Sequence, residues 1–136
     1  MGLVYAEITL RNAADVSYAL EGIITEENVR QTTVQAMVDT GAWTLVINEA
    51  IREKLGLFFN RTSRGRLADG ANVVYQFAGP IEVIWKGRST CCDAIVLPEA
   101  DEILLGAIPL EALDLMVHPN SGELVGVHGD EVLHRI

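Results

Sequence analysis

An acidic residue between two apolar runs is the part of this sequence best placed for chemistry. Asp39 ends the run at 34–38 and is followed by Thr40 and Gly41, after which a second apolar run covers 44–47. Gly41 permits a sharp reversal of the backbone, so the pattern predicts a strand, a tight turn and a second strand. A carboxylate in that position either caps its own turn or takes part in a reaction.

The turn resembles the active-site signature of the retropepsin-like (retroviral-type) aspartic peptidases, and the chain is similar to a single-domain member of bacterial or archaeal type. In that signature an apolar residue precedes Asp-Thr-Gly and an Ala follows it, as Val38 and Ala42 do here. The resemblance implies that Asp39 is catalytic. It also implies that Thr40, Gly41 and Ala42 support the loop and the dimer, with Thr40 bonding across the subunit interface and the Gly41 carbonyl contacting substrate.

Two further segments carry the same resemblance. Leu104, Leu105 and Gly106 match a segment of the family that has two apolar residues followed by Gly. In the family this segment lies against the catalytic loop and precedes a short helix. The tip of its flap, a hairpin that closes over the substrate, is matched by Ala68, Asp69 and Gly70, and Asp-Gly between strand-like arms is a strong hairpin signal. The resemblance implies an all-β fold, a retropepsin-like closed β-barrel or sandwich with one or two short helices and a β-hairpin flap.

The reaction needs a second carboxylate. In peptide hydrolysis by carboxylates, an ionised group takes a proton from water while a protonated group donates one to the scissile carbonyl. Asp-Thr-Gly occurs once in these 136 residues, a length that fits one domain. We therefore expect residues 1–136 to form a single domain that supplies half a site, completed by homodimerisation. Residues 3–10 and 132–136 are candidates for a sheet between the subunits, because unpaired strand edges invite pairing.

The rest of the chain is typical of short strands joined by turns. Alternating apolar and polar residues predict a strand at 5–11, and a weaker pattern predicts another at 16–25. Asn48 and Gly56 are good helix caps, so a short helix is expected between them. Residues 60–65 are expected to form a polar loop. Two hairpins and a second short helix, which begins near Pro109, are expected to follow.

Three positions depart from the retroviral pattern. Trp43 and Thr44 stand where retroviral enzymes usually carry acidic residues, and Ala107 stands where they carry an Arg. The polar lock between these positions is therefore expected to be absent, or replaced by packing of Trp43. A core position is the favoured interpretation of Trp43, and a wall of a substrate subsite is the alternative.

Composition excludes several classes of partner. The net charge of −9 disfavours nucleic acid and anionic membranes, and no apolar run approaches the roughly 20 residues of a membrane-spanning helix. We expect a cytoplasmic protein that acts on a peptide or protein substrate, with Cys91 and Cys92 unbridged. Basic residues gather in two places: Arg61, Arg64 and Arg66, then Lys86 and Arg88. They are interpreted as a solvated face, and steering of acidic substrates is the alternative.

Two rival functions remain open. The first rival is metal binding, and its candidate ligands lack the spacing of a known site: His118, Glu123, His128, Asp130 and His134. Neither a metal nor another cofactor is therefore expected. The stronger rival is a catalytically silent dimeric module that binds or scaffolds an extended peptide by strand addition. The intact Asp39-Thr40-Gly41 favours chemistry, since a binder has no need for two carboxylates at one site.

Overall fold

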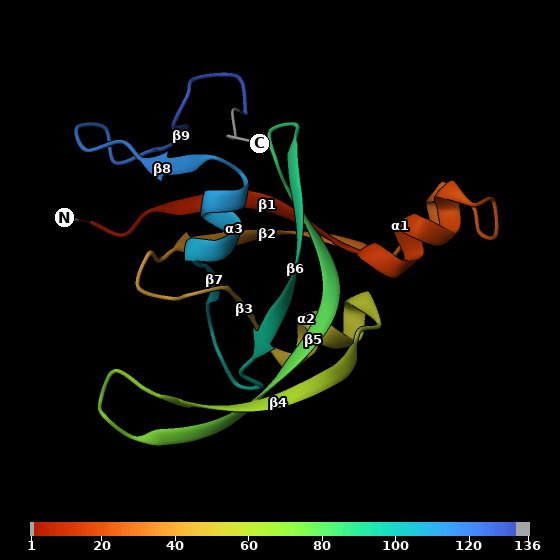
Figure 1. Cartoon of the computed structure of the whole chain (residues 1–136), viewed down its shortest axis with the longest axis horizontal. Coiled ribbons are helices and arrows are strands. Elements are labelled where there is room, and N and C mark those ends of the chain that lie inside the picture. Colours follow the sequence, from red (N-terminus) through yellow and green to blue (C-terminus); the bar gives the residue numbers. More distant parts are fainter. Residues whose placement is uncertain (1, 133–136) are drawn as a thin grey trace.

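A computed structural model of the chain describes residues 2–132, and these residues are mostly strands (Figure 1). In chain order the strands are β1 (Tyr5–Asn12), β2 (Gln31–Val38), β3 (Leu45–Ile47), β4 (Phe58–Arg66), β5 (Asn72–Trp85), β6 (Arg88–Val96), β7 (Ile103–Leu105), β8 (Leu115–Val117) and β9 (Leu124–Gly126). The helices are α1 (Ala13–Leu20), the 3-10 turn η1 (Glu26–Asn28), α2 (Glu49–Leu55) and α3 (Ala107–Ala112).

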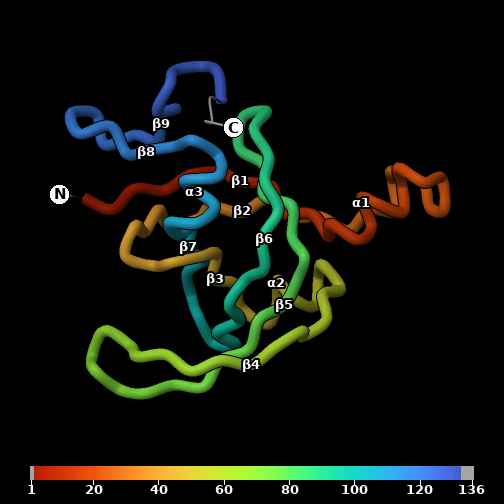
Figure 2. Tube along the Cα trace, in the orientation of Figure 1, coloured from red at the N-terminus to blue at the C-terminus, as the bar shows by residue number. Residues whose placement is uncertain are grey.

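Six of the described strands close into a barrel. The sheet order is β1-β2-β7-β3-β6-β5-β4, and β1 also pairs with β5, which joins the two sides of the sheet. The closure depends on the 14-residue β5, which pairs with β4 over Asn72–Gly79 and with β1 over Ile81–Ile84. The β4–β5 hairpin therefore extends away from the barrel, as the trace in Figure 2 shows. The predicted all-β fold with few short helices and a flap-like hairpin is confirmed.

The short strand β7 organises the centre of the fold. It runs parallel to β2, with Val38 opposite Leu105, and antiparallel to β3, with Val46 opposite Leu104. The chain must therefore leave β2, pass the end of β7 and return as β3. The segment that makes this passage contains Asp39, so the fold holds the candidate catalytic loop at both ends.

The core lies inside the barrel and under α2 and α3. The predicted alternation of the first strand is confirmed, because Ala6, Ile8 and Leu10 are buried while Tyr5 and Glu7 are exposed. The helix predicted between Asn48 and Gly56 is confirmed with both caps. The Asn48 side chain accepts a hydrogen bond from the Ile51 N–H, and Gly56 has φ 63°.

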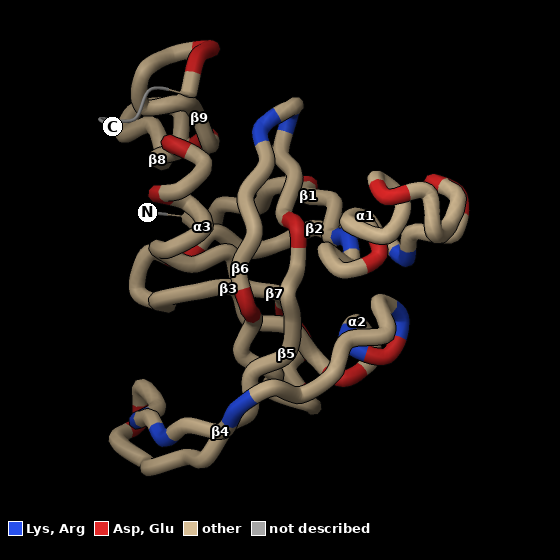
Figure 3. The backbone as a smooth tube through the Cα atoms, turned by 45° about the vertical axis from the view of Figure 1, so that its right-hand side comes forward, with Lys and Arg blue, Asp and Glu red and all other residues tan. Residues whose placement is uncertain are grey.

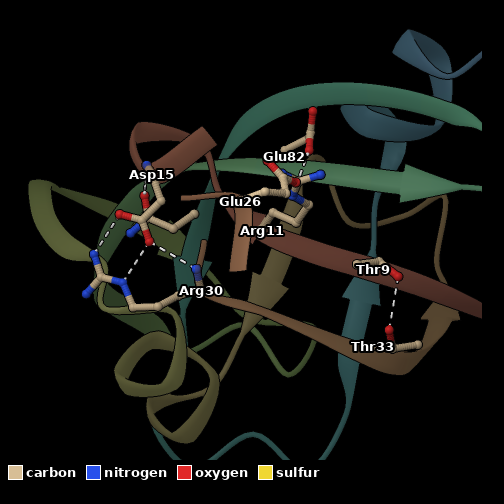
Figure 4. Close-up of polar contacts among 8 residues, drawn as sticks. Thr9, Arg11, Asp15, Glu26, Arg30, Thr33 and Glu82 are labelled. Atoms are coloured by element: carbon tan, nitrogen blue, oxygen red, sulfur yellow. Dashed lines mark hydrogen bonds and ion pairs between the residues drawn. The ribbon is translucent and has the colours of Figure 1, made fainter. Parts of the chain in front are cut away.

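The strand predicted at 16–25 is wrong, because residues 16–20 belong to α1 and residues 21–25 form the turn after it. The Asn12 side chain accepts a hydrogen bond from the Asp15 N–H at 3.0 Å and so starts the helix. The Asp15 carboxylate in turn receives three hydrogen bonds from Arg30, at 2.8, 2.9 and 3.1 Å (Figure 4). These contacts fix α1 against the start of β2, while Leu20 is exposed to solvent beyond the barrel.

The polar loop predicted at 60–65 is also wrong, because these residues belong to β4. Their side chains are mostly exposed, so the strand lacks the apolar alternation that would have revealed it. The solvated role predicted for Arg88 is wrong as well. Its side chain is buried and donates to the carbonyls of Leu113, Asp114 and Gly129.

The proposed intersubunit strands have different outcomes. β1 pairs with β2 along most of its length and with β5 over Thr9–Asn12, so an open edge is left only near Tyr5–Ile8 among the described residues. Residues 133–136 of the second candidate lie outside the described residues.

Candidate active site

Asp39 is the first residue after β2, and its surroundings are set by backbone hydrogen bonds. Its N–H donates to the Leu105 carbonyl at 3.0 Å, and its own carbonyl accepts the Ala42 N–H at 3.1 Å. The side-chain Oδ1 accepts the Gly41 N–H at 2.9 Å. Within residues 2–132 no hydrogen bond reaches Oδ2. This half-buried carboxylate is therefore oriented through Oδ1, and Oδ2 is left available for another hydrogen bond.

The start of α3 is bonded directly to this loop. The Ala107 N–H donates to the Ala42 carbonyl at 2.8 Å, and the Ile108 N–H donates to the Trp43 carbonyl at 2.9 Å. The first N–H groups of a helix have no partner within it, so the loop satisfies donors that would otherwise need water. These backbone bonds connect the segments that a polar side-chain lock joins in the retroviral pattern.

Gly106 permits this close approach. A Cβ at position 106 would lie 2.2 Å from the Thr44 carbonyl oxygen and 2.6 Å from the Ala42 carbonyl oxygen. Only a residue without a side chain fits there. Leu105 beside it is fully buried, and Leu104 is half-buried, so the predicted supporting segment is packed firmly under the loop.

A groove of about 490 Å³ connects the Asp39 loop to the β4–β5 hairpin. Its lining includes most of the loop residues predicted from the sequence, one flap residue and one support residue: Asp39, Gly41, Ala42, Ala68 and Leu104. Sequence reasoning missed other residues of its wall, among them Val73, Tyr75, Ile95 and Leu97. The alternation along β5 could have indicated Val73 and Tyr75, because they share a face with buried Phe77.

The hairpin tip is a tight turn over one end of this groove. The Leu67 N–H donates to the Ala71 carbonyl at 2.8 Å, and the Asp69 carboxylate accepts the Ala71 N–H at 2.9 Å. Gly70 has φ 88°, a conformation that favours glycine. Asp69 and Gly70 are not part of the groove lining as described, whereas Ala68 is.

Trp43 lies on the groove wall and not in the core. Its side chain is 45% exposed, and its ring meets the Phe77 ring edge-on, with centroids 5.5 Å apart. The favoured core interpretation is therefore wrong, and the position fits a subsite wall. Thr44 is buried instead, and its hydroxyl donates to the Asp93 carbonyl at 3.2 Å.

Comparison with known families agrees with this geometry. A family model described as "Aspartyl protease" matches residues 25–108, which include the Asp39 loop, the hairpin and Gly106. The chain belongs to the aspartyl protease family. Among solved structures, the EIAV protease complexed with the inhibitor HBY-793 is similar, with 27% sequence identity over 60% of this chain and 78% of that chain and a TM-score of 0.48. No curated protein matches the chain.

Thr40 faces a different part of this aspartyl protease domain. It is exposed and lines a second, mainly apolar groove of about 460 Å³ beside α3 and β8. Met116 and Val127 contribute to this groove and are 40% and 47% exposed. The sequence indicated neither residue, because an exposed apolar side chain on a short strand, as at Met116, or just after one, as at Val127, looks like any core residue.

The other candidate groups have ordinary structural surroundings. In residues 2–132 no three metal-ligating side chains come together, and His134 lies outside that range. His118 Nδ1 faces two backbone N–H groups at 3.2 Å, and His128 pairs with Asp114 at 2.7 Å. Both cysteines are free, and burial raises the pKa of Cys92 to about 12. No helix among the described residues is long and apolar enough to cross a membrane.

Proposed function

We propose that this chain is an aspartic endopeptidase in which two Asp39 carboxylates, one from each subunit of a homodimer, activate a water molecule. The observation that carries the proposal is the position of Asp39. A rigid backbone network presents its carboxylate to a groove that a hairpin overlies. Peptide or protein chains are the proposed substrates, and a cytoplasmic location remains a prediction.

In the proposed reaction the two carboxylates share one proton, because two like charges so close together cannot both remain ionised. The ionised carboxylate takes a proton from water, whose oxygen bonds to the carbonyl carbon of the substrate. The protonated carboxyl group donates its proton to the carbonyl oxygen. The carboxyl group that took the proton from water then donates it to the nitrogen as the C–N bond breaks. The other carboxylate removes a hydroxyl proton from the tetrahedral intermediate as the new carboxyl group forms, which restores the starting protonation of the pair. The Gly41 N–H, at 2.9 Å, orients each Asp39 throughout.

The remaining site residues have proposed roles that follow their positions. Thr40, Gly41 and Ala42 support the loop and the dimer, and Gly41 also contacts the substrate backbone. Ala68, Asp69 and Gly70 form the flap tip, which closes over bound peptide and excludes water. Leu104, Leu105 and Gly106 support the catalytic loop from below.

The surface beside Thr40 is the proposed contact between subunits. A second copy must approach the Asp39 loop closely if two carboxylates are to share a proton. The apolar groove next to Thr40 includes the exposed Met116 and Val127, and an apolar surface of this kind gains most from being covered. We propose that α3 and β8 of the two subunits meet there, in addition to any pairing of chain ends.

The test compares wild type with Asp39→Asn on a mixed peptide library between about pH 4 and 7, the range in which a carboxylate pair can hold a single proton. Asp101→Asn is the matched control, because Asp101 is an exposed carboxylate outside both grooves. We expect cleavage by wild type and the control and a loss of more than about 1,000-fold in Asp39→Asn. Sedimentation of the same samples measures the dimer content.

The rival function gives a different result in this experiment. A silent binding module would cleave nothing at any pH, while wild type and Asp39→Asn would bind extended peptides equally well. A folded dimer with that behaviour would overturn the proposed endopeptidase. Cleavage that persists in Asp39→Asn would also overturn it, because the activity would then come from another group.

A further inference from the structure

Three arginines lie on the strand that leads to the hairpin tip, in a chain whose net charge is −9. Basic positions follow one another along β4 toward the tip, while acidic positions are spread over the rest of the chain, including β5, β6 and the hairpin turn (Figure 3). Within residues 2–132 the arginines in ion pairs are Arg11, Arg30 and Arg52. The three on β4, namely Arg61, Arg64 and Arg66, have no carboxylate partner in that range.

Two of these arginines lie close to the groove, one in its lining and one against an aromatic ring beside it. Arg66 is part of the groove lining, together with Asp39 and Ala68. The Arg61 guanidinium lies 3.7 Å from the centroid of the Phe77 ring, and the two residues lie opposite each other in the pairing of β4 with β5. A guanidinium that stacks on a ring keeps the N–H groups at its edge available for a carboxylate.

The aromatic cluster connects Arg61 to the groove wall. Phe77 meets both Trp43 and Tyr75 edge-on, with centroid distances of 5.5 Å, and Trp43 and Tyr75 line the groove. Along β4, Arg61 shares a face with the groove-lining Gly65, since side chains alternate and the register irregularity lies before Arg61. By the same alternation Arg66 falls on the other face, and it joins the groove lining as the last residue of the strand, where the chain enters the hairpin tip. One cation, Arg66, therefore lines the groove with Asp39, and a second, Arg61, stacks on the Phe77 ring that contacts two aromatic residues of the groove wall.

Arg64 provides an internal comparison. It lines a neighbouring hollow with Asn72 and Val74, which shares Gly65 and Val73 with the groove but does not include Asp39. It has the same charge as Arg61 and Arg66, lies on the same strand and is similarly exposed. A long-range effect of charge would involve all three arginines about equally, whereas direct contact would involve only those at the groove.

We propose that the groove selects peptides with an Asp or Glu side chain beneath the hairpin, and that Arg61 and Arg66 are the residues that determine this preference. The inference rests on the proposed peptidase function and names its substrate class. The net negative charge of the chain repels acidic peptides in general, so the unpaired guanidinium groups create the local exception. Both can form paired N–H to carboxylate hydrogen bonds with an acidic side chain.

The experiment uses peptides that wild type cleaves. At each position of such a peptide in turn, three versions are made, with Glu, Gln or Lys at that position. At the position under the hairpin, we expect kcat/KM for Glu to exceed that for Gln by about five- to tenfold, and Lys to be the poorest. The preference should fall as salt is raised to about 1 M, because exposed ion pairs are screened. Arg61→Gln/Arg66→Gln should abolish it, and Arg64→Gln should retain it.

The possible outcomes separate this inference from the proposed function. If wild type cleaves peptides but treats Glu and Gln alike at every position, the inference is wrong and the peptidase function stands. If Arg64→Gln weakens the preference as much as the double variant does, direct contact is wrong. If wild type cleaves nothing, the proposed peptidase function is wrong, and binding of the same peptides to Asp39→Asn, measured by fluorescence anisotropy, then decides the inference. Glu-peptides must bind more tightly than Gln-peptides, and Arg61→Gln/Arg66→Gln must remove the difference.

Discussion

Replacing Gly106 by Ala tests whether the close approach of β7 to the Asp39 loop holds the site together. The new Cβ would lie 2.2, 2.6 and 2.8 Å from three backbone atoms of Ala42 and Thr44, whereas unstrained contacts are about 3.5 Å or longer. The backbone must therefore move by about 1 Å, and overpacking of this kind costs about 1–3 kcal/mol. The φ of −91° suits Ala, so backbone strain at position 106 itself adds nothing.

The same movement should reach the chemistry. Ala42 accepts the hydrogen bond from the Ala107 N–H and closes the turn that begins at Asp39, so its displacement changes the direction of the carboxylate. A misplacement of about 1 Å can cost on the order of 100-fold in rate. We therefore expect Gly106→Ala to lower the free energy of unfolding by about 1–3 kcal/mol and kcat/KM by about 100-fold.

Urea unfolding and peptide cleavage at one pH measure the two effects. Gly2→Ala is the control, because a Cβ there meets nothing within 4 Å, and it should change neither quantity. If Gly106→Ala matched wild type in both stability and turnover, the close contact would not be what holds the loop. A loss of stability without a loss of turnover would separate the packing of β7 from the geometry of the site.

Two further predictions concern the helix α1 and the proposed subunit contact. The hydrogen bonds from Arg30 lower the pKa of Asp15, so the pair stabilises the fold above the ordinary carboxyl pKa of about 4 and this contribution disappears as pH falls through the lower value. Asp15→Asn should therefore lower the free energy of unfolding by about 1–2 kcal/mol at pH 7 in thermal or urea unfolding, a modest value because Arg30 is half exposed. The difference from wild type should shrink as the pH falls below the ordinary carboxyl pKa and through the lowered one, and a difference independent of pH would contradict the reasoning. Met116→Lys should weaken dimerisation by about tenfold or more, measured by sedimentation, and should reduce activity with it. Ile23→Lys should change neither quantity, because Ile23 is an exposed apolar residue away from both grooves. Unchanged dimer content in Met116→Lys would exclude this surface as the subunit contact.

The sequence was sufficient to predict elements whose signals are local. Alternation revealed β1, caps revealed α2, and Asp-Gly revealed the hairpin turn, because each depends on a few neighbouring residues. The helix α1 also had a local signal. Asn12 and Asp15 have the spacing of a helix cap and its partner, and the apolar residues after them outweighed that signal in the prediction.

The errors on β4 and Trp43 have a different cause. β4 is a strand because β5 pairs with it, and its mostly exposed side chains carry no pattern that a core would impose. Trp43 is exposed because the groove exists beside it, and the groove forms only when the hairpin, the Asp39 loop and β6 come together. Such features depend on tertiary contacts, so no window of the sequence contains them.

The architecture of β5 connects the base of the hairpin to the barrel and leaves the tip separate from it. The strand pairs with β4 in its first part and with β1 in its last, and the exchange of partners lies around Gly79. A Cβ on Gly79 would lie 2.4 Å from the Asp93 Oδ1, and Asp93 Oδ2 accepts a hydrogen bond from Asn60 of β4 at 3.2 Å. The base of the hairpin is therefore connected to the barrel wall by a hydrogen bond, whereas the hydrogen bonds of its tip stay within the turn itself among residues 2–132. Under the proposed peptidase function, substrate preference can therefore change through side chains near the tip, such as Arg66, with little effect on the closure of the barrel.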